Sequence, residues 1–139
     1  MTATQTLTEG SRAVIECVYA AVKAGDVDRL FGYFSDDIVL YEPPFLPFGQ
    51  AYRGKEGFLE LLPQISQYLD VSQVEVHYLI ADQERVVGCI SMPDRLTGEF
   101  THMLELFTLR DSKVTRIQLF YFDAGTMVAR GVATREPPE

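Results

Sequence analysis

Two glutamates have surroundings in which a carboxyl group could exchange protons. The first, Glu42, ends the apolar series Ile38 and Leu40 in "DDIVLYE" and is followed directly by two prolines. A carboxyl group enclosed by prolines and phenylalanines loses hydration, which raises its pKa. General acids and bases need a pKa near the working pH, so Glu42 is a candidate for proton transfer. The alternative interpretation is a glutamate at a strand end that faces water.

The second glutamate, Glu105, interrupts the apolar run "MLELFTL". Side chains alternate along a strand, so Met103 and Phe107 share its face. A lone acid on a buried face has to find a partner, stay protonated or face a cavity. With the opposite orientation, Leu104 and Leu106 point inward and Glu105 is solvated. The pattern alone leaves both orientations open.

A third acid, Asp123, closes the last expected strand on the same face as Tyr121. It could be an acid of the same pocket. It could equally cap a short helix in "AGTMVARG", since aspartate is a preferred N-cap residue. Both interpretations remain open at this point.

The sequence gives little indication of metal or cofactor chemistry. His77 and His102 are its two histidines, and they fall on segments that we do not expect to be neighbouring strands. Neither has a nearby acid or cysteine in the spacing typical of a metal site, although either could transfer protons. The sequence has no P-loop, GxGxxG, GxSxG or CxxC motif. We therefore expect no metal and no organic cofactor.

Composition limits the classes of partner. The chain of 139 residues is long enough for one domain with a core, and its formal net charge is -8. So acidic a protein repels phosphate backbones and anionic lipids, so we expect no nucleic-acid or membrane partner. Cys17 and Cys89 lie in apolar segments and are expected to be buried free thiols. The N-terminus lacks a signal-peptide pattern, so we expect a cytoplasmic protein.

The elements that position these residues begin with a helix. Valines recur at spacing four between residues 14 and 22, which is typical of a helix with one buried face. We expect this helix to begin at Glu9, with Thr8 or Ser11 as its cap, and residues 1–8 to be disordered.

Two further helices are expected. Gly25 suits the end of the first helix, and Asp26 can cap a short second one. The apolar stripe of that short helix is Val27, Leu30, Phe31 and Phe34. Gly54 opens a third helix, whose stripe is Phe58, Leu61, Leu62 and Ile65. Pro63 falls inside this stripe, so we expect a kink or break there.

The second half of the chain is strand-like. After "DDIVLYE", four segments rich in β-branched and aromatic residues follow, separated by short turns. These are "VEVHYLIA", "RVVGCISM", "EFTHMLELFTL" and "VTRIQLFYFD". Strands linked so closely pair antiparallel. The sequence therefore predicts a single α+β domain over residues 1–139, with one mostly antiparallel sheet, three helices and a disordered tail at 134–139.

The last strand indicates which face is covered. Ile117, Leu119 and Tyr121 alternate with polar residues, which places them toward the helices and leaves Phe120 and Phe122 on the outer face. Adjacent exposed aromatic rings suggest a homodimer through that face.

The loop from Pro43 to Tyr52 is stiffened by prolines and rich in aromatic residues. We interpret it as a lid over the pocket, with Phe45, Phe48, Tyr52 and Tyr121 at the mouth to exclude water.

Several of these motifs together resemble one family. "VYAAVKAGDVDRLFGYFSDDIVLYEPP", "YRGKEGF" and "SKVTRIQLFYFD" are similar, in order and spacing, to segments of NTF2-like proteins, which include ketosteroid isomerases and SnoaL-like polyketide cyclases. The resemblance covers almost the whole chain. It implies a cone-like α+β fold in which a curved sheet wraps three helices around an apolar pocket. The residues expected to line that pocket are Val18, Tyr19, Phe45, Phe48, Tyr52, Phe58, Met103, Phe107, Leu119 and Tyr121.

The resemblance also implies roles for the acids. Glu42 matches the position of the proton-transferring carboxylate of ketosteroid isomerases, as Glu in place of Asp. Glu105 falls near the second acid of those isomerases, the protonated donor of the oxyanion hole. That acid is a well-known example of a carboxyl group that an apolar site keeps neutral. The isomerase tyrosine of the first helix aligns with Val18, and Tyr19 is one position away, about a hundred degrees around the helix.

Two functions are compatible with these features. The first is a cofactor-independent enzyme of isomerase, cyclase or dehydratase type, acting on a small hydrophobic carbonyl or polyketide-like molecule. Glu42 would then move a proton, and Glu105 or Asp123 would donate a hydrogen bond. The second is a binding or interaction module without catalysis, because a fold does not fix a function. A cavity that touches both glutamates would favour the enzyme.

Overall fold

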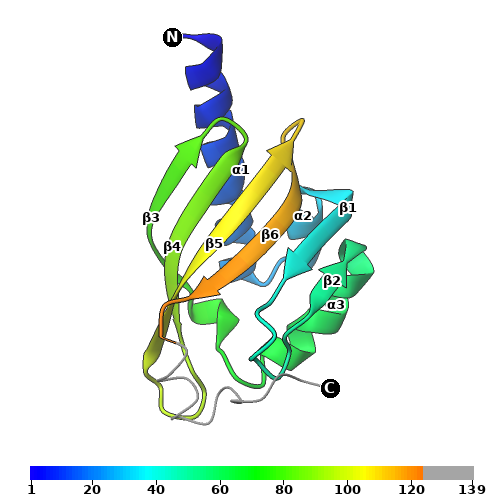
Figure 1. The fold of residues 1–139 in the computed structure, drawn as a ribbon, viewed down its shortest axis with the longest axis vertical. Coiled ribbons are helices and arrows are strands. Elements are labelled where there is room, and N and C mark those ends of the chain that lie inside the picture. The colour runs from blue at the N-terminus through cyan, green and yellow to red at the C-terminus, as the bar shows by residue number, and fades with distance from the viewer. Residues whose placement is uncertain (124–139) are drawn as a thin grey trace.

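The computed structural model describes residues 1–123 of the chain and forms one layer of helices on one sheet (Figure 1). The helical elements are α1 (Ala3–Ala24), α2 (Val27–Phe31), α3 (Gly54–Ile65) and the short 3-10 turn η1 (Val71–Gln73). The strands are β1 (Phe34–Tyr41), β2 (Ala51–Arg53), β3 (Glu75–Asp82), β4 (Arg85–Pro93), β5 (Phe100–Arg110) and β6 (Lys113–Tyr121). The expected helix in "AGTMVARG" and the tail at 134–139 lie outside the described residues.

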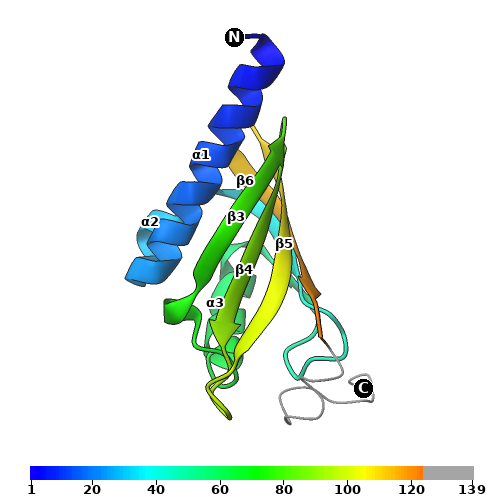
Figure 2. The same ribbon diagram turned by 90° about the vertical axis from the view of Figure 1, so that its left-hand side faces the viewer.

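The sheet is six-stranded, in the order β2-β1-β6-β5-β4-β3. Every neighbouring pair is antiparallel except β1 and β6, the first and last long strands, which run parallel. The sheet curves around the helices (Figure 2), which confirms the predicted α+β cone. Strand β2 was not predicted, because three residues are too short to produce an alternating pattern.

Helix α1 is longer than expected. It begins at Ala3, where Thr2 and Gln5 form a capping box, and it ends at Gly25, whose φ of 67° is left-handed. The expectation that residues 1–8 are disordered is therefore wrong for Ala3–Thr8. Their exposed turns project beyond the sheet (Figure 1) and carry no apolar stripe, so no periodic pattern marks them as helical. Thr8 Oγ1 anchors this end by accepting a hydrogen bond of 2.8 Å from the Gln83 backbone N–H.

Aromatic packing joins the two other helices to β1. Phe34 opens β1 instead of continuing α2, and its ring lies 5.4 Å from that of Phe58 on α3. The Phe31 ring of α2 packs against the same ring at 5.8 Å. Pro63 does not interrupt α3, which continues to Ile65. Pro63 has no N–H to donate to the Leu59 carbonyl. Leu59 is half exposed, so water can supply that hydrogen bond instead.

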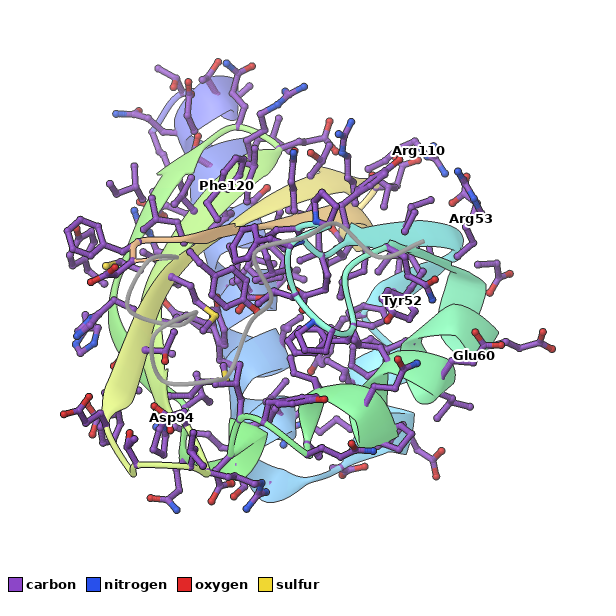
Figure 3. The ribbon with its side chains drawn as sticks, turned by 60° about the horizontal axis from the view of Figure 1, so that its bottom comes forward. Tyr52, Arg53, Glu60, Asp94, Arg110 and Phe120 are labelled. Atoms are coloured by element: carbon purple, nitrogen blue, oxygen red, sulfur yellow. The ribbon has the colours of Figure 1, made fainter. Side chains whose placement is uncertain are left out.

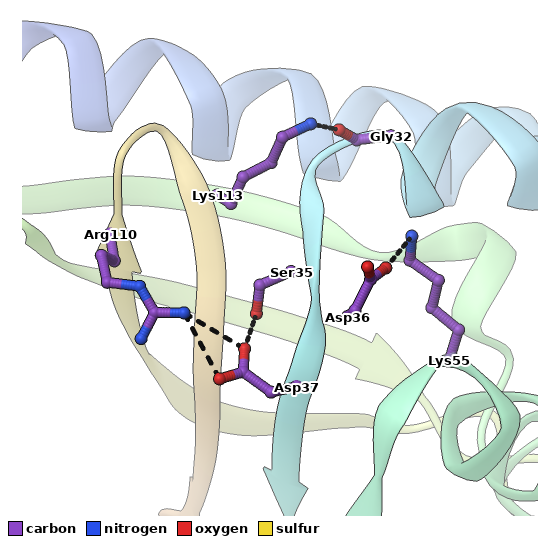
Figure 4. Close-up of polar contacts among 7 residues, drawn as sticks. All are labelled: Gly32, Ser35, Asp36, Asp37, Lys55, Arg110 and Lys113. Carbon is purple, nitrogen blue, oxygen red and sulfur yellow. Dashed lines mark hydrogen bonds and ion pairs between the residues drawn. The ribbon is translucent and has the colours of Figure 1, made fainter.

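Exposed polar contacts fasten the start of β1 to its neighbours (Figure 4). They are Arg110 with Asp37 at 3.3 Å, Lys55 with Asp36 at 3.2 Å, and Lys113 with the carbonyl of Gly32. Solvent screens such exposed contacts, so each contributes little to stability. Their effect is to hold the register of β1, the strand that leads to Glu42.

The loop between β1 and β2 is part of the core. Leu46, Phe48 and Tyr52 are buried, with Phe48 and Tyr52 only 1% and 2% exposed. The Tyr52 hydroxyl donates to the Phe48 carbonyl at 2.6 Å, and Tyr52 lies between β2 and α3 (Figure 3). A Cβ at Gly49 would lie 2.0 Å from the Pro43 carbonyl oxygen, so the loop turns too tightly for any side chain there. These contacts give the loop the character of a packed segment and not of a mobile lid.

The two faces of β6 are as predicted. Ile117 and Leu119 are buried against the helices, while Phe120 is 47% exposed and Phe122, just beyond the strand, is 87% exposed. On β5, Met103 and Phe107 are buried. The face of β5 that carries Glu105 is therefore the inner one, which resolves the two orientations left open by the sequence.

Candidate functional site

A cavity of about 80 Å³, called here the inner cavity, lies between the sheet and the helices. Its walls are apolar except for four side chains, Tyr19, Glu42, Glu105 and Tyr121. The expected lining residues found in the wall are Val18, Tyr19, Phe58, Met103, Phe107, Leu119 and Tyr121. Both glutamates that the sequence singled out therefore face one apolar space.

Glu42 is held at the meeting point of two strand ends. It follows β1 directly, and the parallel register of Tyr41 with Gln118 brings the end of β6 alongside. There the Tyr121 hydroxyl donates to Glu42 Oε1 at 3.1 Å. Glu42 is 5% exposed, and burial raises its pKa well above the ordinary value. The hydrogen bond from Tyr121 lowers that pKa, and the charge of Glu105 raises it further.

Glu105 has a matching partner on α1. The Tyr19 hydroxyl donates to Glu105 Oε1 at 3.0 Å, and the two rings of Tyr19 and Phe107 pack edge to face at 5.7 Å. Burial raises the pKa of Glu105 to about 7, and the bond from Tyr19 opposes this rise. Burial and the nearby carboxylate also raise the pKa of Tyr19, so its hydroxyl stays protonated and remains a donor.

The contact between Tyr19 and Glu105 depends on a glycine. Gly88 on β4 is paired with Glu105 across the sheet, and its α-carbon faces the Tyr19 ring. A Cβ at this position would lie 2.1 Å from the Tyr19 hydroxyl oxygen. The Tyr19 hydroxyl therefore occupies the space that a side chain at position 88 would fill. Sequence reasoning missed this residue, although a glycine inside the strand pattern "RVVGCISM" is a recognised signal of close approach.

The inner cavity has acidic side chains in its described lining and no basic ones. Among the described residues that line it, none is a lysine, arginine or histidine. With no cation to stabilise the ionised form, each carboxyl group is favoured in its neutral form and has only a tyrosine as partner. The arrangement can therefore accept a proton at one glutamate while the other, still protonated, donates a hydrogen bond.

Some expected site residues lie elsewhere. Phe48 and Tyr52 belong to the core described above, and Phe45 contacts the Tyr121 ring at 6.3 Å without reaching the inner cavity wall. Asp123 is exposed, beyond the end of β6, and is not among the described residues of the wall. In contrast, Tyr19 reaches Glu105 although the resemblance matched the isomerase tyrosine to its neighbour Val18.

The histidines lie on the outer side of the sheet. As expected, their strands β3 and β5 are not adjacent, but the rings of His77 and His102 stack at 5.8 Å across β4. His77 Nε2 also lies 2.8 Å from Ser91 Oγ. Within residues 1–123, no three His, Cys, Asp or Glu side chains are grouped in a way that could hold a metal ion. Nor does any helix in that range have the length and apolar character to span a membrane.

Comparison with solved structures gives the same fold. An NTF2-like protein from Burkholderia xenovorans is 22% identical, with 90% of this chain and 97% of that one covered and a TM-score of 0.72. A proposed ketosteroid isomerase from Kribbella flavida is 17% identical over 99% and 87%, also at 0.72. TerC, co-crystallised with polyporic acid, is 20% identical over 88% and 97%, at 0.71. At these identities the likeness concerns the fold.

Sequence comparison identifies the family. No curated protein matches the chain. Residues 7–117, which are most of the chain and include the whole described sheet except the last four residues of β6, match the family described as SnoaL-like domain. This range includes Tyr19, Glu42, Gly88 and Glu105. The chain therefore belongs to the SnoaL-like domain family, and its fold is that of NTF2-like proteins.

Proposed function

We propose that this protein is a cofactor-independent acid–base enzyme that acts on a small, neutral, hydrophobic carbonyl compound. One observation carries the proposal. Two glutamates with raised pKa, each hydrogen-bonded to a tyrosine, face a single apolar cavity. Carboxyl groups in such surroundings are expensive to bury and are characteristic of proton-transfer sites.

The chemistry would divide between the two pairs. Glu42, in its ionised form, removes a proton from the carbon next to the carbonyl group, and the electron pair left behind moves onto the carbonyl oxygen. Tyr121 assists, because its hydrogen bond favours the ionised form of Glu42. Return of the proton from Glu42 to a different carbon of the same conjugated system completes an isomerisation. If the enolate carbon instead attacks a second carbonyl carbon of the same molecule, a ring closes and the oxygen of that carbonyl group takes the proton from Glu42.

Tyr19 and Glu105 would stabilise the enolate. Burial keeps Tyr19 protonated, and Glu105 is protonated below its pKa of about 7, so each can donate a hydrogen bond once the Tyr19 hydrogen turns from Glu105 toward a ligand oxygen. Donors already fixed in a cavity that excludes water stabilise a developing oxyanion strongly, each by about 10²- to 10³-fold in rate. The isomerase, cyclase and dehydratase types share this enolate step, so all remain within the proposal.

Hydrogen exchange tests the proposal without knowledge of the natural substrate. The protein is incubated in D₂O with a panel of small cyclic ketones, and deuterium uptake next to the carbonyl group is followed by mass spectrometry. We expect the protein to accelerate exchange for part of the panel, and Glu42→Gln to lower that acceleration about 100-fold. Glu42→Asp, which keeps a carboxylate, should retain measurable exchange.

The matched control is Glu60→Gln on α3, where the side chain projects away from the molecule (Figure 3). It removes the same charge outside the inner cavity and should leave exchange unchanged. Undiminished exchange in Glu42→Gln would refute the proposal. Ketones that bind tightly without any exchange would indicate the binding module instead.

We also propose that two copies of the chain associate through the outer face of the sheet. Leu104 and Phe120 are paired in register on β5 and β6, both are exposed, and Tyr78 of β3 is exposed near the same face. Figure 3 shows Phe120 on the opposite side of β6 from α3. So large an apolar group of side chains is unusual on a surface that faces water.

The interface is tested by solution scattering. Phe120→Ser should convert a dimer into a monomer at micromolar concentration, because it removes an apolar anchor from the centre of the face. Leu59→Ser, which removes a similarly exposed apolar side chain from α3, is the control and should leave the dimer intact. A dimer that survives Phe120→Ser would place the interface elsewhere.

A further inference from the structure

The inner cavity is separated from a second space by a single layer of side chains. This second space, called here the helix-side hollow, has a volume of about 330 Å³ and lies between the α1–α2 junction, the C-terminal half of α3 and η1. The residues that line both spaces are Val22, Leu30, Phe58, Leu62 and Val71. These five side chains form the wall between the two spaces.

Two other surface spaces share residues with the inner cavity. One, of about 490 Å³, shares Met103 and Tyr121 and lies against the outer face of β5 and β6. The other reaches Glu42. It is an outer depression of about 460 Å³ beside Pro43 and Pro44, and it shares Glu42, Leu119 and Tyr121 with the inner cavity. Passage there would have to separate the hydrogen-bonded Glu42 and Tyr121 at the joined ends of β1 and β6. The backbone of a sheet does not move aside as a side chain does, so this wall is more rigid than the one toward the helix-side hollow.

The wall toward the helix-side hollow has the opposite character. Its side chains are all apolar, and four of the five are only half-buried, Leu30 being the buried exception. The Phe58 ring is held by Phe31 and Phe34, at 5.8 and 5.4 Å. Leu62, one turn further along α3, is half-buried, and the next residue, Pro63, withholds one backbone hydrogen bond from the last turn.

We propose that ligands enter the inner cavity from the helix-side hollow, and that Leu62 is the gate residue that limits their size. The proposal rests on the function proposed above, since it requires the inner cavity to bind a ligand. The rim of the hollow has Asp26, Ser66 and Ser72 as its polar residues and no cationic side chain among the described residues. The route therefore admits a neutral, apolar and narrow molecule more readily than an anionic one.

Association kinetics of a neutral fluorescent probe, 2-naphthol, test the route by stopped flow. Leu62→Trp fills the passage, so we expect its association and dissociation rates to fall together, at least tenfold, with the dissociation constant changed less than threefold. Leu62→Ala opens the passage and should raise both rates. This coupled change of two rates at nearly constant affinity is the signature of a gate, and a residue that merely contacts the ligand would change affinity.

The matched control is Pro44→Trp, which places the same bulky side chain at the outer depression and should leave both rates unchanged. Thermal unfolding of each variant confirms that it is folded before kinetics are compared. Unchanged rates in both Leu62 variants, or slowing in Pro44→Trp alone, would overturn the route while leaving the proposed function intact. Failure of the unaltered protein to bind any probe or ketone would instead refute the proposed function and the route with it.

Discussion

Gly88 determines how the Tyr19 hydroxyl meets Glu105. Gly88 has no side chain, and a Cβ added to it would collide with the Tyr19 hydroxyl oxygen, which lies 2.1 Å away. Backbone pairing across β4 and β5 fixes Gly88 directly beside Glu105, so neither residue can shift without disturbing the sheet. We infer that Gly88 is a positioning residue for this tyrosine–glutamate pair.

Gly88→Ala should break that pair. The added methyl group displaces the Tyr19 hydroxyl, so we expect a loss of about 2 kcal/mol in the free energy of unfolding, from overpacking and from the lost hydrogen bond. Tyr19→Phe removes the hydroxyl and with it the closest clash. The double variant should therefore be more stable than the sum of the two single losses predicts, by about 1 kcal/mol. Urea unfolding of all four proteins measures this coupling.

Two further observations separate positioning from general damage. Gly10→Ala on α1, where a Cβ would contact nothing within 4 Å, is the matched control and should not destabilise the protein. In Gly88→Ala the pKa of Glu105 should rise above about 7, because the bond from Tyr19 lowers it in the unaltered protein. Infrared titration of the carboxyl group follows this change, and strictly additive losses with an unchanged pKa would contradict the inference.

The sequence predicted the acids better than their partners. Glu42 was accessible to sequence reasoning, because an apolar alternation and two prolines surround it. Tyr19 was expected in the pocket wall, but its contact with Glu105 was not predicted, because counting positions around a helix ignores side-chain length. Val18 and Tyr19 are both buried, and the longer side chain reaches a sheet residue that its angular position alone would not select.

At the scale of elements, periodic signals succeeded and aperiodic ones failed. The alternation along β6 correctly separated Leu119 from Phe120, and Gly25 correctly ended α1. The start of α1 was misplaced because the turns before Gly10 are exposed and rely on the cap at Thr2 and not on an apolar face. Capping contributes on the order of 1 kcal/mol, but it involves only the residues at the helix end and so leaves no repeated pattern in the sequence.

The loop from Pro43 to Tyr52 illustrates a different limit. Its prolines and aromatic rings suggested a lid, but composition does not say whether rings face a ligand or the core. Here the buried hydroxyl of Tyr52 found a partner in the Phe48 carbonyl, which allowed both rings to pack inside. The gate that we propose is instead a side chain near the C-terminal end of α3, Leu62.

For the whole molecule, the buried glutamates couple stability to pH. A glutamate with a folded pKa of about 7, above its ordinary value of 4.5, holds a proton that the unfolded chain has already released. The stability contributed by the protonated form is present below pH 4.5 and is lost as pH rises through 7. The loss from Glu105 amounts to about 3 kcal/mol at pH 8.

Glu105→Gln should remove this dependence. The amide cannot ionise, so we expect the variant and the unaltered protein to differ by less than about 0.5 kcal/mol at pH 4.5, and the variant to be more stable by about 3 kcal/mol at pH 8. Urea unfolding at both values measures the difference. Glu99→Gln, at an exposed position, controls for the loss of a surface charge. An equal effect of Glu105→Gln at both pH values would contradict the assignment.

The parallel pairing of β1 with β6 also determines when the site comes into being during biosynthesis. Glu42 and Tyr121 are separated by 79 residues, and Tyr19 and Glu105 by 86. A ribosome delivers β6 after the other five strands of the sheet, so both glutamates of the growing chain stay exposed to water in their ionised form until β6 has been made. Such distant contacts also form slowly. At neutral pH, the final folding step should therefore take up protons from the solvent. The number of protons taken up would report that both glutamates have been buried.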